Sequence, residues 1–426
     1  MIIYDPLYGD FDLPPFLCKM VDTPEVRRLS QIRLLNTMSP ALATLGELRR
    51  YSHTLGVVFL ARLPILQSFS EDERKAFAAT AMLHDIGTAP FAHLFEYHLK
   101  ELVQWDHESE IRKILLGTHA PENKAHQLFY GRTIGLAKAL GHARVSRDIV
   151  LEMVQGVHPL SRLLFGTLDL DNLDNIARMA WALGLESQCD TIRAVATHIS
   201  IRPKDASLYL PLLMRPHVEA WARVRRRIYD ILVFDPPTVA AQATLSAAIR
   251  IAIESNLLGA DDWSMTDEQL LNYLASCEQT KGMICNEYYG HLPSLAFAIH
   301  LPRSLSELGV PSRDRACKLI ESALLNEYDG SKPLGYVFED RGTFEKELCF
   351  RDPESGETWS VGTTSRSVIL YGFLRTPRGT MSKERTSRAI EHLANDLGMD
   401  RDELRSFKRD NANRSDHEQR TFDYAP

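Results

Sequence analysis

The chain has 426 residues, of which 44% are hydrophobic and 25% carry a charge, a balance typical of a soluble protein with a sizeable core. This length exceeds that of most single domains and predicts one large domain with a smaller appendage. The net charge of −7 excludes the overall positive charge of many nucleic-acid-binding proteins, so only a local basic patch would favour nucleic acid as a partner.

Three further features bear on where the protein resides. No apolar run approaches the roughly 20 residues that a membrane span requires, so we expect no membrane partner. The first residues lack the basic and then apolar pattern of a secretion signal. The six cysteines form no Cys-x-x-Cys pair and are Cys18, Cys189, Cys277, Cys285, Cys317 and Cys349. We therefore expect a cytoplasmic protein with reduced thiols.

Helical patterns dominate the chain to about residue 330. Ser70 and Glu73 form a capping box, which predicts the start of a helix whose buried face ends with His84 and Asp85. Gly87 ends that helix, so the His–Asp pair lies where its side chains can enter a cleft. The other helices that we expect span residues 21–36, 46–66, 92–103, 107–116, 134–141, 144–155, 186–199, 215–232, 236–255, 266–276 and 311–325.

A further helix from about Asp171 places Asp171, Asp174, Asn175 and Arg178 on one face, with Asp169 just before it. Beyond residue 330, short β-favouring runs take over, at residues 335–338, 345–350, 358–361 and 367–371.

The run from Asp352 to Gly356 predicts a hairpin turn, and a last helix is expected from about Lys383 to Gly398. The fold class is therefore mainly α, with a small C-terminal α+β appendage. We expect a helical domain over residues 1–330, a mixed α/β region over 331–410 and a disordered tail over 411–426.

A lone His53, the adjacent pair His84 and Asp85, and a later acidic run around Asp171 form a mixed imidazole and carboxylate set. Such a set suits a divalent cation that holds phosphate and activates water. Taken singly, each His is as readily a hydrogen-bonded core residue, and only the combination favours a metal site.

In order and number, these motifs resemble the deoxynucleoside triphosphate triphosphohydrolase branch of the HD-domain superfamily, which includes dGTPases and dNTPases with a sterile-alpha-motif. The resemblance covers roughly residues 1–255 and implies a helical HD-domain core. It rests on the segments Asp5–Gly9, Asp22–Leu29, Arg50–Val57, His84–His93, Trp105–Glu108 and Asp169–Asp174, with a weaker match at Ile228–Asp230.

The resemblance implies that a divalent metal is bound by His53, His84, Asp85 and Asp171. It does not choose between manganese, iron, magnesium and zinc. Asp169 and Asp174 lie close to Asp171 and are alternatives to it, although the family pattern places the ligand at the middle aspartate.

The resemblance also implies catalytic and substrate-binding residues. His93 and His107 match two His near the scissile bond, with His107 as general acid and Glu96 as the carboxylate that orients such a His. Arg50 matches an α-phosphate ligand, and Tyr229 matches an aromatic residue that stacks under the deoxyribose. The alternatives are a solvated carboxylate for Glu96, a surface ion pair for Arg50 and an ordinary helix residue for Tyr229.

The chain departs from the family in the residues that read the substrate. Thr88 replaces a second His, Leu34 replaces a Gln that contacts the sugar, and Asn172 replaces a Lys that holds distal phosphates. Asn175 and Met179 stand where the family has Tyr and Asp. Asn175 is therefore the substrate contact that we expect at its position.

These implications predict hydrolysis of (deoxy)nucleoside triphosphates to nucleoside and triphosphate by attack of water at the α-phosphorus. The resemblance further implies a homo-oligomer and activation by a second nucleotide. The basic run Arg223–Arg227 is either a phosphate contact or a solvated face. Two alternatives remain open: an HD phosphomonoesterase or phosphodiesterase acting on nucleotide monophosphates or a nucleotide signal, and a nucleotide-sensing regulator without turnover.

Overall fold

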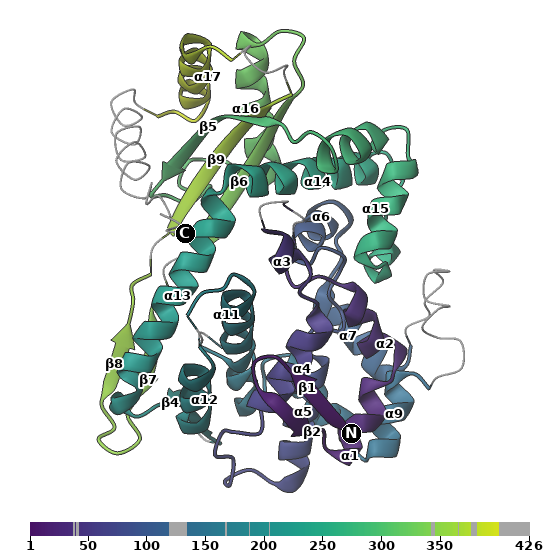
Figure 1. Ribbon diagram of the computed structural model, residues 1–426, viewed down its shortest axis with the longest axis vertical. Coiled ribbons are helices and arrows are strands. Elements are labelled where there is room, and N and C mark those ends of the chain that lie inside the picture. The colour runs from purple at the N-terminus through teal and green to yellow at the C-terminus, as the bar shows by residue number, and fades with distance from the viewer. Residues whose placement is uncertain are drawn as a thin grey trace, which may run out of the picture.

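The computed structural model describes residues 1–36, 39, 42–118, 134–166, 168–186, 188–203, 205–341, 346–364, 366–375 and 381–399. Within these residues the fold is mainly α-helical with three small sheets, which confirms the predicted fold class (Figure 1). The predicted tail over 411–426 lies outside the described residues. Among the helices that are described, none is both long and apolar enough to cross a membrane.

The helical part begins with a short hairpin of β1 (Ile2–Asp5) and β2 (Gly9–Asp12). Its helices are α1 (Pro15–Val21), α2 (Pro24–Arg28), α3 (Ala43–Gly46), α4 (Arg50–Leu60), α5 (Glu71–Leu83), α6 (His93–Val103), α7 (His107–Leu116), α9 (Leu136–Ala143), α10 (Arg147–Val154), α11 (Leu170–Ala182), α12 (Cys189–His198), α13 (Arg215–Phe234), α14 (Pro236–Glu254) and α15 (Asp267–Ser276).

Helix α4 packs against both α5 and α11 in the middle of this part (Figure 1). The predicted capping box opens α5: the backbone N–H of Glu73 donates to Ser70 Oγ at 3.2 Å, and that of Ser70 donates to Glu73 Oε2 at 2.7 Å. The helix ends at Leu83 with His84 as its C-cap, earlier than the predicted end at Gly87, so His84 and Asp85 follow its last turn. This packing places the polar residues at the ends of the three helices close to one another.

The predicted helix over 21–36 is wrong in its second half. Helix α2 ends at Arg28, and after one 3-10 turn the chain is extended. There the backbone N–H of Arg33 donates to Asp267 Oδ2 at 2.7 Å, and that of Leu34 donates to the Leu48 carbonyl at 2.9 Å. Tertiary hydrogen bonds have replaced the helical ones, which local periodicity does not reveal.

A four-stranded sheet of order β3-β4-β7-β8 joins distant parts of the chain. Strands β3 (Ser200–Arg202) and β4 (Asp205–Tyr209) follow α12, whereas β7 (Leu348–Arg351) and β8 (Thr358–Val361) form the predicted C-terminal hairpin. The indole N–H of Trp359 donates to the Leu210 carbonyl at 2.9 Å. The hairpin is thereby fixed to the helical part.

The third sheet has the order β5-β9-β6 and packs against α16 and α17 in a second core (Figure 1). Its elements are β5 (Ser294–Leu301), β6 (Pro333–Arg341), β9 (Arg366–Leu374), α16 (Arg313–Glu327) and α17 (Lys383–Asp396). Strand β5 precedes residue 330, so the sheet draws on both of the regions that the sequence separates there. The division of the chain into domains at 330 stays a prediction.

Asp267 at the start of α15 holds the turn that leads into α6. Phe91 and Ala92 both have left-handed backbone conformations, with φ of 54° and 49°. Asp267 is fully buried, and its Oδ1 accepts from the backbone N–H of Phe91 at 2.9 Å while its Oδ2 serves Arg33. This carboxylate thus stabilises a strained turn directly before His93.

We predict that Asp267→Ala lowers the free energy of unfolding by about 3 kcal/mol, because buried donors lose their acceptor and Arg33 loses a charged partner. A denaturant titration measures this change. Asp261→Ala, at an exposed position six residues earlier, is the matched control and should leave the stability unchanged. Equal stability of the two variants would contradict the role of Asp267.

Candidate functional site

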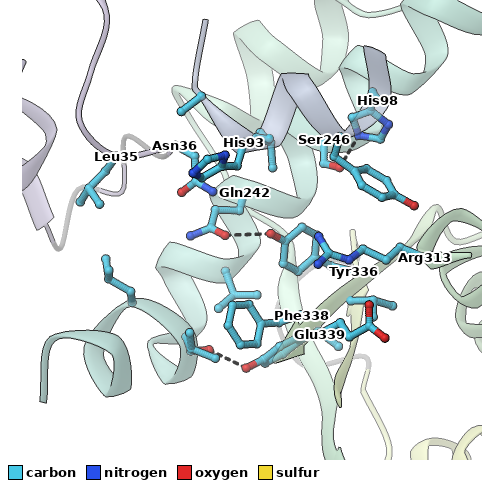
Figure 2. A pocket seen from close by; sticks show the side chains of 18 of the residues that line it. Leu35, Asn36, His93, His98, Gln242, Ser246, Arg313, Tyr336, Phe338 and Glu339 are labelled. Carbon is cyan, nitrogen blue, oxygen red and sulfur yellow. Dashed lines mark hydrogen bonds between the residues drawn. The ribbon is translucent and has the colours of Figure 1, made fainter. Parts of the chain in front are cut away.

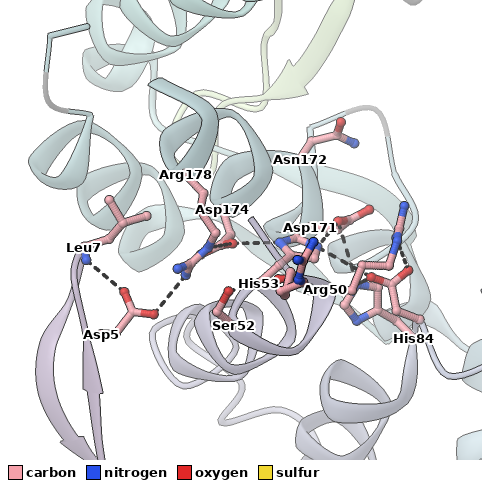
Figure 3. Close-up of polar contacts among 12 residues, drawn as sticks. Asp5, Leu7, Arg50, Ser52, His53, His84, Asp171, Asn172, Asp174 and Arg178 are labelled. Carbon is pink, nitrogen blue, oxygen red and sulfur yellow. Dashed lines mark hydrogen bonds and ion pairs between the residues drawn. The ribbon is translucent and has the colours of Figure 1, made fainter. Parts of the chain in front are cut away.

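The ends of α5, α4 and α11 bring His53, His84, Asp85 and Asp171 together (Figure 3). His53 Nε2 lies 2.8 Å from Asp171 Oδ1 and 3.9 Å from Asp85 Oδ2. His84 Nε2 lies 3.4 Å from Asp85 Oδ2 and 3.7 Å from Asp171 Oδ1. The four groups expected to bind metal therefore lie close together, although they come from three separate segments of the chain.

Two atoms of this cluster are buried without a hydrogen-bond partner among the described residues. They are His84 Nε2 and Asp85 Oδ2. The Nδ1–H of His84 donates to the Ala81 carbonyl at 2.9 Å, which turns Nε2 toward the cluster as a lone pair. A buried imidazole nitrogen and a buried carboxylate oxygen that face each other fit a cation, because neither can satisfy the other. The donor set therefore fits a divalent metal.

His53 is held from behind by Asp174. Its Nδ1–H donates to Asp174 Oδ2 at 2.7 Å, which leaves Nε2 for the cluster. Burial lowers the pKa of His53, but the hydrogen bonds with Asp171 and Asp174 outweigh burial and raise the pKa to about 9.

Asp174 is itself fully buried and needs positive partners. Arg178, one turn later on α11, donates to both of its oxygens at 2.9 Å, and the Tyr8 hydroxyl donates to Oδ1 at 2.7 Å. Arg178 also donates to Asp5 Oδ2 at 3.0 Å (Figure 3). A continuous polar chain thus runs from β1 to the candidate metal centre.

The structure separates the three aspartates of the acidic run. Asp169 is the N-cap of α11, and its Oδ1 accepts from the backbone N–H of Asn172 at 2.7 Å. Burial, and then the nearby charge of Asp171, raise the pKa of Asp169 to about 7. Asp174 supports His53. Of the three, Asp171 is the one whose carboxylate joins the cluster, with 35% of its side chain exposed.

The side chains expected to act on phosphate surround the cluster. Arg50 Nη1 donates to Asp85 Oδ1 at 2.6 Å, and Arg50 Nε is buried without a partner among the described residues. Glu96 is buried and accepts from His93 Nδ1 at 3.0 Å, while 86% of the His93 side chain is exposed. Burial raises the pKa of Glu96, but the hydrogen bond with His93 and the nearby positive charges together outweigh burial, and the pKa falls to about 2.

His107 begins α7, and its Nε2 is buried without a hydrogen-bond partner in the described chain. Burial lowers the pKa of His107, while the negative charges of Glu96 and Asp85 oppose this effect. His107 and Glu96 are therefore close enough to interact electrostatically, but it is His93 that bonds to Glu96.

A cavity of about 370 Å³ opens beside the cluster, within the size range of small-molecule sites. Arg50, His93, Asn175 and Tyr229 line the end near the cluster. Asn175 Oδ1 is buried and has no partner among the described residues, so it is available to a ligand. The expected substrate-binding residues thus share one cavity.

Two cations lie near the cluster, and sequence reasoning missed one of them, Lys346. Lys346, just before β7, donates to the Gly166 carbonyl at 3.5 Å. Burial lowers its pKa, Asp169 and Asp171 raise it, and Arg225 of α13 lowers it, so these charges lie near one another. Arg225 lies over the Tyr229 ring, 4.7 Å from its centroid. Arg225 belonged to a basic run that the sequence singled out, but nothing local distinguishes Lys346.

Comparisons with known proteins bear on the family. No family model matches the chain. It is 25% identical over 242 residues to the uncharacterized protein YwfO of Bacillus subtilis, which is 55% of this chain and 51% of that protein. It is 32% identical over 120 residues to human deoxynucleoside triphosphate triphosphohydrolase SAMHD1, 25% of this chain and 19% of that protein. The SAMHD1 homolog of Dictyostelium discoideum is 24% identical over 204 residues, 44% of this chain and 38% of that protein.

A crystal structure of a phosphohydrolase from Bacteroides thetaiotaomicron has the same fold, with a TM-score of 0.60 and 15% sequence identity. The match covers 87% of this chain and 99% of that one. The chain spans about half or less of the length of the curated relatives it matches. The predicted resemblance to HD-domain phosphohydrolases is nevertheless confirmed, in sequence over 25% and 44% of the chain for the two named relatives and in fold over 87% of it.

We predict that Gly56→Ala weakens metal binding. A Cβ at Gly56 would lie 2.0 Å from Asp174 Oδ1 and 2.4 Å from Arg178 Nη2, so Asp174 must move away from His53. Loss of such a supporting contact costs about 10- to 100-fold in metal affinity. Calorimetric titration with Mn²⁺ measures it.

Gly46→Ala is the matched control for this experiment. Nothing lies within 4 Å of a Cβ at Gly46, so this variant should bind Mn²⁺ as the unaltered protein does. If both variants bound Mn²⁺ equally well, the support of His53 by Asp174 would not govern the site.

Proposed function

We propose that this protein is a metal-dependent hydrolase of (deoxy)nucleoside triphosphates that releases nucleoside and triphosphate. The observation that carries the proposal is the pair of buried atoms His84 Nε2 and Asp85 Oδ2, which have no hydrogen-bond partner among the described residues and lie beside a cavity lined by Arg50, the ion-pair partner of Asp85. A core histidine would have its hydrogen bonds satisfied. This pair instead needs a cation, and the cavity beside it offers room for a ligand.

The residues proposed to hold the metal are His53, His84, Asp85 and Asp171. When bound, a divalent cation there supplies charge stabilisation for phosphate and lowers the pKa of water. Arg50 is placed to bind the α-phosphate: its Nε has no partner among the described residues, and a guanidinium matches phosphate oxygens in pairs. Stabilising the charge that develops on phosphate is the largest contribution expected in such a reaction.

His107 is proposed to give its proton to the leaving oxygen. Burial keeps its pKa low in the free protein, with Glu96 and Asp85 acting in the opposite direction. A phosphate beside His107 adds negative charge and favours the protonated imidazole when substrate is bound. Glu96 is hydrogen-bonded to His93, which lines the cavity, and the two are proposed to position the reacting groups.

The distal phosphates are proposed to bind Lys346 and Arg225. The family's lysine at this place is Asn172 here, and its side chain donates to Asp169 Oδ1 at 2.9 Å. Lys346 and Arg225 repel each other across a partly buried region, and an anion between them would relieve that repulsion. The homo-oligomer and the activation by a second nucleotide that the resemblance implies are part of this proposal.

The test is chromatography of an equimolar pool of the eight common NTPs and dNTPs after incubation with the protein and Mn²⁺. We expect nucleoside and triphosphate to appear, and Asp171→Ala to reduce the rate by at least about 100-fold because it removes a proposed ligand. Asp190→Ala, at an exposed aspartate of α12, is the matched control and should retain the rate.

Two outcomes would contradict the proposal. All eight nucleotides left intact, despite their mutual presence as activators, would favour a regulator that binds without turnover. Inorganic phosphate in place of triphosphate would favour the phosphomonoesterase or phosphodiesterase alternative.

We predict that Lys346→Ala raises the KM for triphosphates by about tenfold, because one charge-assisted phosphate contact is lost. The kcat should change less, since Lys346 lies away from the proposed leaving oxygen. Steady-state kinetics measure both constants. Lys332→Ala, at an exposed lysine before β6, should leave both unchanged, and an unchanged KM in Lys346→Ala would remove this residue from the phosphate site.

A further inference from the structure

The cavity continues beyond the proposed catalytic end and reaches the C-terminal α+β unit. Its outer half is lined by Tyr336 and Phe338 of β6, Arg313 of α16, Gln242 of α14 and Tyr97 of α6 (Figure 2). Strand β6 pairs only with β9 among the described strands and packs against α14. Strand β6 and α16 of the C-terminal unit and helices α6 and α14 of the helical part therefore line one cavity.

Flat apolar side chains and a few polar groups make up this outer half. Tyr336 donates its hydroxyl proton to Gln242 Oε1 at 2.9 Å, and Figure 2 shows the amide nitrogen of Gln242 turned away from that contact. The pKa of Tyr336 is raised to about 12 by burial, so its hydroxyl stays a donor at neutral pH. Aromatic walls with polar groups at their edges suit a flat heterocycle.

In this outer half of the cavity, Arg313 carries a positive charge that no carboxylate of the described chain pairs with. Its guanidinium lies over the Tyr97 ring, 5.1 Å from the centroid, and its Nε is buried without a partner among the described residues. No carboxylate in the described chain forms an ion pair with it. The neighbouring Arg250, by contrast, donates to Asp314 at 3.0 Å and to Glu321 at 3.3 Å. Arg313 is therefore the arginine whose donors are available to a ligand.

We infer that the outer half of the cavity binds the nucleobase of the substrate and that Arg313 selects bases with carbonyl oxygens at their edge. The inference rests on the proposed function, because phosphates held near Arg50 and the metal ligands direct the rest of a nucleotide along the cavity.

Arginine only donates, and its fork pairs with the O6 and N7 acceptors of guanine. Thymine and uracil also present carbonyl acceptors. Adenine and cytosine carry an amino group at the equivalent edge, which would leave two donors facing each other. The α+β unit, through Arg313 and Tyr336, thereby takes part in substrate choice.

The experiment is calorimetric binding of the α,β-imido analogues of dGTP, dTTP, dATP and dCTP to the full chain with Mn²⁺. We expect the dGTP and dTTP analogues to bind more tightly than the dATP and dCTP analogues, by about tenfold. Arg313→Gln should remove most of this difference, because glutamine both donates and accepts. Arg315→Gln, an exposed arginine on the same helix, should preserve it.

The melting temperature of each variant reports whether it folds, and Arg313→Lys supplies a second substitution that keeps the charge but loses the fork. Equal affinity for the four analogues in the unaltered protein would overturn the inference, as would an unchanged preference in both Arg313 variants. The bond that the proposed reaction breaks joins the α-phosphorus to the 5′ oxygen and is kept in these analogues, so chromatography after each titration checks that the analogue is intact and that binding is measured without turnover. A base preference that depends on Arg313 in a protein that hydrolyses no nucleotide would therefore refute the proposed function alone.

Discussion

The contact on which the rest of the site depends is the hydrogen bond between His53 and Asp174. It places a buried carboxylate beside a buried imidazole, and such charges are costly unless both are paired. Arg178 and Tyr8 neutralise and orient Asp174, and Asp5 accepts from Arg178 in turn. Because each group has a partner, the chain from β1 to α11 is rigid, and the Nε2 lone pair of His53 is aimed at one point.

The hydrogen bond between His53 and Asp174 also explains why a glycine, Gly56, stands one turn after His53. Helix α4 must approach α11 closely enough for Asp174 to reach the imidazole, and Gly56 is where the two helices meet. The segment Arg50–Val57, which contains the lone histidine of the predicted metal set, therefore meets two requirements. His53 supplies the imidazole, and Gly56 supplies the space for the carboxylate that holds it.

The sequence predicted the helical core and the cluster, because both depend on local periodicity and on the spacing of a few chemically distinctive residues. The capping box at Ser70 is a local feature and was correctly predicted, whereas α5 ends at Leu83, before the predicted end at Gly87. The separate roles of Asp169 and Asp174 were not predicted, since three acidic residues within six positions differ only in the groups that α4 and the chain before α11 place beside them. Arg33 lies outside a helix because its backbone N–H bonds to Asp267. Asp267 is 234 residues away in the sequence, so local periodicity could not predict this bond.

Arg313 and Lys346 show where sequence reasoning ends. Neither lies in a motif, and each reaches the cavity or the cluster only because sheets join segments far apart in the chain. The hairpin of β7 and β8 brings Lys346 to the helical part through the bond of Trp359 to Leu210. The β5-β9-β6 sheet and α16 bring Arg313 to α6. Long-range pairing of this kind has no signature in composition or periodicity.

The two histidines of the cluster differ in how they tolerate genetic change around them. His53 is oriented by the side chain of Asp174, which a single codon change removes. His84 is oriented by the Ala81 carbonyl, which every amino acid at position 81 supplies. Substitutions at position 81 are therefore limited only by the volume of a buried side chain. Substitutions at position 174 are limited by the need for a carboxylate that accepts from His53. A lineage that loses activity step by step would be expected to lose the Asp174 half of the centre first.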